Sequence, residues 1–143
     1  MEIEDERIRD ELREIRLIAM ETPSLIGRTV PAIVVDMNVQ RIAYATPPAD
    51  ELFGYIEGSL LGLPLEKLIP ERFRERHRQH FANFVAHPAK RNMGAMEMEL
   101  FGLSRDGTEF PISIGLHPIV IGGRPCVIAT ILRTVGTRAK ENK

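Results

Sequence analysis

The sequence lacks several features that would place it in well-defined functional classes. It has one cysteine in 143 residues, so it can form neither an internal disulfide nor a cysteine-cluster metal site. No apolar run approaches the roughly 18 residues that cross a bilayer, and the acidic start MEIEDERIRD does not suit a signal peptide. The net charge of -1 argues against nucleic acid or an anionic membrane as a general partner. We therefore expect a cytoplasmic globular domain whose function depends on a local site.

The first 28 residues are predicted to form an amphipathic flanking helix. Ile8, Leu12, Ile15 and Ala19 recur at steps of four, three and four on an otherwise charged segment. Pro23 should end this helix because proline cannot continue the hydrogen-bond ladder. The apolar stripe needs a cover, either this domain or a second copy of the chain. We predict a homodimer through this helix, and insertion into the groove of a foreign protein is the alternative.

The rest of the sequence predicts two strands, short helices, one longer helix and three final strands. PAIVVD and RIAYAT have the composition of a hairpin. A short helix follows, with Thr46 as its N-cap, Pro47 at its first position and Gly54 at its end. The longer helix should cover residues 71–86. The last strand candidates, separated by the turn signals RDG and GG, are AMEMELFGLS, TEFPISIGLHPIV and RPCVIATILRT.

This order of motifs resembles the PAS sensory-domain family. The resemblance rests on DELFGY, LLGLPLEKLIPERFRERH, RNMGAMEMELFGLSRDGTEFPISIGLHPI and VIATILRT, and extends roughly from Val30 to Val135. It implies an α+β domain over residues 29–135, in which a five-stranded antiparallel sheet has short helices and one longer helix on one face. It also implies a small-molecule cavity and a role in bacterial-type signalling rather than catalysis. Residues 136–143 should be a charged tail or linker, and no output domain is recognisable.

One face of the longer helix carries the most informative side chains. A projection at 100° per residue places Phe73, His77, His80, Phe81 and Phe84 together. The resemblance to haem-binding members of the family implies that His77 could bind the iron of haem b. Two methionines, Met96 and Met98, alternate with acids on the next strand, and a thioether is an acceptable iron ligand. The first hypothesis for a cofactor is therefore a haem with His77 on one side and Met96 or Met98 on the other.

The sequence leaves two alternatives to haem. In the first, the chain is a ligand-free dimerisation module, with His77 an ordinary packed helix residue and the methionines core filler. In the second, the cavity binds another small molecule. Covalent flavin photochemistry is not expected, because light-sensing members carry a reactive cysteine in an Asn-Cys-Arg motif where this chain has GLPLEKLIP. The one cysteine, Cys126, should be buried as a small apolar residue.

We predict that a ligand in the cavity shifts the population of two packings and that the flanking helices transmit this shift. We find no convergent acid, base or nucleophile that would make the chain an enzyme. His87 is predicted to lie at the surface or to cap the helix end, and His117 to be exposed. The predicted cavity lining is Val34, Phe53, Leu61, Leu68, Phe73, His77, Phe81, Met96, Met98, Ile114 and Ile128.

Overall fold

The computed structural model describes residues 6–22, 29–93 and 100–134 of the chain. Within these ranges, no helix is both long and apolar enough to cross a membrane. The elements in chain order are α1 (Glu6–Glu21), β1 (Ala32–Asp36), β2 (Arg41–Ala45), α2 (Pro47–Leu52), the 3-10 turns η1 (Leu65–Leu68) and η2 (Glu71–Phe73), α3 (Arg74–Ala86), β3 (Arg91–Met93), β4 (Leu100–Leu103), β5 (Glu109–Ile121) and β6 (Arg124–Arg133).

The strands form one antiparallel sheet in the order β2-β1-β6-β5-β3. The short strands β3 and β4 pair with successive stretches of β5, so six strands occupy five positions. The predicted five-stranded antiparallel sheet is therefore confirmed. Of the predicted strand over residues 95–104, only the part from Leu100 lies within the described residues, and β3 was not predicted.

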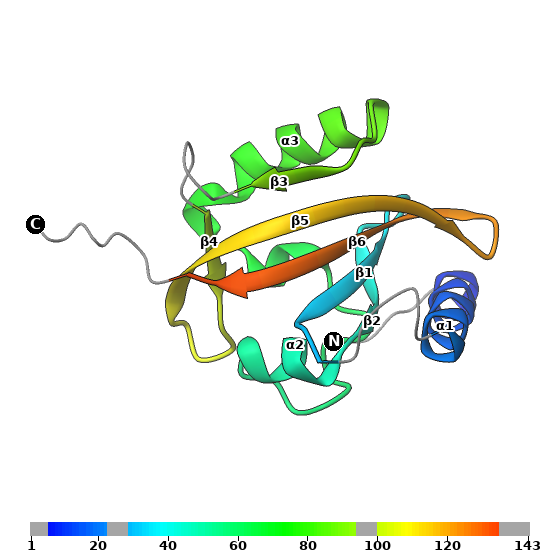
Figure 1. Cartoon of the computed structure of the whole chain (residues 1–143), viewed down its shortest axis with the longest axis horizontal. Coiled ribbons are helices and arrows are strands. Elements are labelled where there is room, and N and C mark those ends of the chain that lie inside the picture. Colours follow the sequence, from blue (N-terminus) through cyan, green and yellow to red (C-terminus); the bar gives the residue numbers. More distant parts are fainter. Residues whose placement is uncertain (1–5, 23–28, 94–99, 135–143) are drawn as a thin grey trace, which may run out of the picture.

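Apolar side chains cover both faces of the sheet. Successive residues of a strand point to opposite faces, and all five residues of β1 are buried. Ile33 and Val35 belong to the core on the side of α2, η1 and α3. Ala32 and Val34 belong to a second core under α1. Figure 1 shows α1 beside β2 and the β5–β6 turn, well away from α3.

The predicted N-terminal helix is present as α1, and its apolar stripe packs on its own domain. Leu12, Ile15 and Ala19 are buried, and Ile15 is completely inaccessible to solvent. Arg124 at the β5–β6 turn pairs with Glu14 at 2.9 Å and lies 3.6 Å from a carboxylate oxygen of Glu11. The stripe is therefore covered by the chain's own sheet, which is the first of the two alternatives considered from the sequence. The predicted domain limits at residues 28 and 135 fall outside the described residues.

The N-cap residue of α2 makes a connection that its sequence position did not indicate. Thr46 precedes the helix as predicted, but its side chain makes no capping hydrogen bond. Its hydroxyl instead donates to the carbonyl of Val30 at 2.7 Å and accepts from the amide of Ala32 at 3.0 Å. The side chain thus ties the start of α2 to the start of β1. The end of α2 is as predicted, since Gly54 adopts φ +77°, which favours glycine.

Candidate functional site

A cavity of about 240 Å³ lies between the inner face of the sheet and α3. The strands contribute aliphatic side chains to its wall because alternate residues of each point inward. The wall consists of Ile33, Val35, Phe53, Leu65, Leu68, Ile69, Phe73, Arg76, His77, His80, Phe81, Phe84, Leu100, Phe101, Ile112, Ile114, Leu116, Val127, Ala129 and Ile131. A largely apolar concavity with a few polar groups is the usual form of a small-molecule site.

The structure places most, but not all, of the predicted lining around this cavity. The predicted residues that line it are Phe53, Leu68, Phe73, His77, Phe81 and Ile114. Leu61 is not part of the wall, and Met96 and Met98 lie outside the described residues. Whether any lining residue binds a cofactor stays a prediction.

The placement of Val34 and Ile128 in the cavity is wrong. Both residues belong to the core under α1, on the opposite face of the sheet. Their neighbours Val35 and Val127 face the cavity instead. The sequence contained no signal for this choice, because both strands are apolar at inward and outward positions alike.

Aromatic rings and arginines surround one side of the cavity. Phe73 and Phe101 stack with their ring centroids 6.1 Å apart. The guanidinium carbon of Arg72 lies 4.4 Å from the Phe73 ring centre, and that of Arg76 lies 5.0 Å from it. Cations over aromatic faces are held by the ring quadrupole. This side of the wall is therefore both apolar and positively charged.

His77 is a half-buried residue of the cavity wall. Its ring centroid is 5.8 Å from that of Phe81. Its Nδ1 atom is buried and has no hydrogen-bond partner among the described residues. Burial lowers the pKa of this imidazole, and His80 and Arg78 lower it further, against an opposing effect of Glu66. His77 is therefore neutral at pH 7 and can donate or accept a hydrogen bond.

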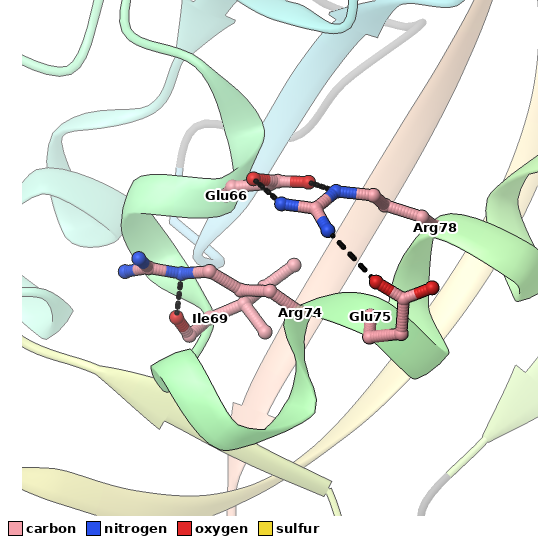
Figure 2. A network of polar contacts seen from close by, with 5 residues as sticks. All are labelled: Glu66, Ile69, Arg74, Glu75 and Arg78. Carbon is pink, nitrogen blue, oxygen red and sulfur yellow. Dashed lines mark hydrogen bonds and ion pairs between the residues drawn. The ribbon is translucent and has the colours of Figure 1, made fainter.

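Polar contacts hold α3 over the cavity. Arg78 donates to both carboxylate oxygens of Glu66 in η1, at 2.8 and 3.2 Å, and to Glu75 at 3.1 Å. Arg74 donates to the carbonyl of Ile69 at 2.9 Å. Figure 2 shows these bonds joining the first turns of α3 to the segment before it. They fix the end of the helix that carries the cavity-lining Phe73 and His77.

The dimensions of the cavity test the haem hypothesis. About 240 Å³ is below the roughly 300–1,000 Å³ of pockets that take drug-sized ligands, and the haem macrocycle is larger than such ligands. The partners predicted for the far side of the iron, Met96 and Met98, are outside the described residues. The cavity as described is thus smaller than a haem would need, the haem hypothesis itself stays a prediction, and haem has no part in the function proposed below.

Cys126 is remote from the cavity. It is completely buried, as predicted, in the core between the sheet and α1. Burial, together with nearby Asp36, raises the pKa of its thiol to about 12, so the reactive thiolate is scarce at neutral pH. This thiol cannot reach a molecule on the other face of the sheet. Within the described ranges, no cluster of three or more His, Cys, Asp or Glu could hold a metal ion.

The lowered pKa of His77 predicts a pH-dependent stability. Below the unfolded-state value of 6.5 the unfolded chain gains a proton at this site before the folded chain does. Stability should therefore fall as pH decreases from about 6.5 toward the folded-state pKa. His77→Leu should remove this part of the acid sensitivity, measured as the midpoint of urea unfolding at pH 7.5 and 5.5. His87→Leu, at the exposed end of α3, is the control, and an equal effect of both substitutions would contradict the expectation.

No model of a known protein family matches the chain. A protein of Azorhizobium caulinodans, described as uncharacterized, is 26% identical over 121 residues. The match covers 84% of this chain and 16% of that protein, so the chain corresponds to a small part of its relative.

Several solved structures are similar to most of the chain. A PAS domain from Desulfitobacterium hafniense superimposes with a TM-score of 0.63 at 15% identity, covering 77% of this chain and 97% of that one. The PAS domain of an HTR-like protein from Haloarcula marismortui gives 0.63 at 16% identity, covering 91% and 100%. A Rhodobacter sphaeroides LOV protein gives 0.62 at 17%, covering 95% and 71%. These likenesses show that the chain has the PAS fold.

Proposed function

We propose that this chain is a non-catalytic sensory module that binds a small, largely apolar molecule in the cavity under α3. The observation that carries the proposal is the cavity itself, about 240 Å³ within the main core and walled by aliphatic and aromatic side chains. Core interiors are normally packed without voids larger than a water molecule. A molecule that fills this space would gain the contacts that the surrounding side chains lack.

The sheet is the proposed route by which binding is transmitted. The same strands carry cavity residues and α1 contacts in alternation: in β6, Val127 and Ala129 face the cavity and Cys126 and Ile128 face α1. A ligand that favours one arrangement of the sheet therefore also changes the surface on which α1 packs. This is a population shift between two packings, with α1 as the element that reports it.

The fold neighbours support a sensory role. One of them is described as a PAS domain from a two-component sensor histidine kinase, with a TM-score of 0.61 at 10% identity. Another is described as an RNA-binding light-oxygen-voltage receptor, with a TM-score of 0.63 at 21% identity. For this chain, signalling to a further domain or partner is part of the proposal.

Self-association through α1 is a second part of the proposal. Since Leu12 and Ile15 pack on the chain's own sheet, a second copy would have to use the outward side of the helix. Leu17 and Met20 on that side are 45% and 44% exposed. We propose these two residues as the contact of a homodimer.

Binding of a neutral two-ring probe tests the proposed function. A cavity of roughly 150 Å³ accepts benzene, so about 240 Å³ suits a compact bicyclic compound such as 2-naphthylmethanol. At a probe concentration of about 100 times Kd, the folded state gains about 2.7 kcal/mol. The melting temperature should then rise by roughly 5–10 °C, measured by differential scanning calorimetry.

Single substitutions at two adjacent residues test where the probe binds. Ala129→Phe places a ring in the cavity and should abolish the probe-induced rise, because Ala129 lines the cavity. Thr130→Phe adds a similar bulk at the next position, which is exposed and pairs with Gly115 of β5, and should leave the rise intact. Absence of binding to the wild-type chain, or its retention in Ala129→Phe, would refute the proposed site.

A further inference from the structure

The charged and titratable side chains in the described cavity wall are all basic. Among the described residues, the charged or titratable side chains in its wall are Arg76, His77 and His80, all from α3, and no aspartate or glutamate lines it. Arg76 and His80 are exposed, so the cavity reaches the surface at this corner. A cationic ligand would find no carboxylate in this described wall, since Glu66, which acts on His77, is paired with Arg78, whereas an anionic group would meet hydrogen-bond donors and positive charge.

Arg76 differs from Arg72 and Arg78, which lie near it in the chain. Arg72 pairs with Glu109 at 2.6 Å, and Arg78 pairs with Glu66 and Glu75. Among the described residues, Arg76 has no carboxylate partner, and its guanidinium lies over the face of the Phe73 ring. Cation-ring contact leaves the N–H groups of a guanidinium free to donate to an anion. One cation at the rim of the cavity is thus held by a ring and not by a carboxylate of the described residues.

His77 adds a second donor at the same corner. It is adjacent to Arg76 in the chain and one helical turn from His80, so the three side chains project from neighbouring positions of α3. Its ring lines the cavity, and a neutral imidazole keeps one N–H group that can donate to a ligand oxygen. A planar carboxylate suits this arrangement, because guanidinium groups bind carboxylates through paired N–H donors.

We infer that the ligand of this cavity is a small aromatic carboxylate, whose ring lies among the aliphatic and phenylalanine side chains and whose carboxylate lies at the corner formed by Arg76, His77 and His80. The inference rests on the proposed function, since it needs the cavity to bind a ligand. It adds a charge requirement that the apolar wall alone would not impose. The space limits the apolar part to one or two fused rings.

Two probes of matched shape separate this inference from the proposed function. The compounds 2-naphthoate and 2-naphthylmethanol share a ring system and differ in the charged group. Isothermal titration calorimetry at pH 7.5 and low salt should give an affinity at least tenfold higher for 2-naphthoate. Arg76→Gln should weaken 2-naphthoate binding about tenfold and leave 2-naphthylmethanol binding unchanged, which also shows that the variant is folded.

Two further variants act as controls. Arg76→Lys keeps the positive charge and should retain part of the preference for the carboxylate. Arg13→Gln removes the same charge from the exposed side of α1, on the other face of the sheet, and should change neither affinity. Equal affinity of the wild-type chain for both probes, or an unchanged preference in Arg76→Gln, would overturn the carboxylate inference while the proposed function stands. If neither probe binds, both fail.

Discussion

Ile15→Ala is expected to lower the free energy of unfolding by about 2–5 kcal/mol. Ile15 has no solvent exposure and lies at the centre of the α1 stripe, against the core formed with β1 and β6. The substitution removes three carbons from a site that the rigid sheet cannot close, so a cavity remains. Urea unfolding followed by circular dichroism measures the loss.

The control for this prediction lies on the same helix. At protein concentrations too low for the proposed homodimer to form, Leu17→Ala, at a residue that is 45% exposed, should cost less than about 0.5 kcal/mol. The loss for Ile15→Ala should also be independent of protein concentration, because the contact lies within one chain. If the loss disappears on dilution, or if Leu17→Ala costs as much as Ile15→Ala, then α1 is stabilised mainly by a second copy and the packing described above is not the one in solution.

Gly102→Val is expected to destabilise the chain by about 3 kcal/mol, near the upper end of overpacking effects. Gly102 is a buried residue of β4 whose place beside two rings admits no side chain. A β-carbon there would lie 2.9 Å from a ring atom of Phe53 and 3.0 Å from one of Phe110. These two rings pack on each other with centroids 5.4 Å apart, and both are buried, so neither can move freely.

A second substitution can make room for the valine. Phe110→Leu shortens one of the rings that the new side chain would strike. The double variant should therefore be more stable than the sum of the two single losses predicts, by at least about 1 kcal/mol. Thermal and urea unfolding of the four proteins in this cycle measure the coupling. Simple additivity would show that the valine is accommodated without contact to the Phe110 ring.

The face of α3 was predictable from sequence because its aromatic residues recur at helical spacing. Phe73, His77, Phe81 and Phe84 recur at helical spacing among arginines, and all of them line the cavity. Phenylalanines that share one side of a helix indicate the face that packs on the core. The turn at Gly107 was predictable for a similar local reason, since its φ of +92° favours glycine.

The inward and outward sides of the central strands were not predictable in the same way. In β6, four consecutive buried residues, Cys126 to Ala129, contain no polar residue to mark the solvent side. The choice depends on register with β1, and a shift of one residue reverses every side chain. In β2 the register changes opposite the Val34–Val35 step, so that Ala43 and Tyr44 both join the core under α1. Such a bulge depends on tertiary packing and leaves no distinct sequence pattern.

Of the three residues that carry the carboxylate inference, the two histidines could be identified from the sequence and Arg76 could not. His77 and His80 were identified from the helical projection, but no local pattern distinguishes Arg76. Its distinction from Arg72 and Arg78 depends on which glutamates lie near each guanidinium in the folded chain. Pairings between residues 12 or 37 positions apart are set by the tertiary structure, which local sequence patterns do not report.

The ion pairs that hold α3 in place also bear on how quickly a ligand can enter and leave. The Arg78 side chain is 56% exposed, as is that of Arg72, and exposed pairs of this kind are weakened by salt. The helix therefore has a firm apolar attachment through Phe81 and Phe84 and a weaker polar attachment at its first turns. Opening at those first turns needs only a local rearrangement, with the sheet intact. Residence time in the cavity is then governed by the motion of one helix end and should shorten as ionic strength rises.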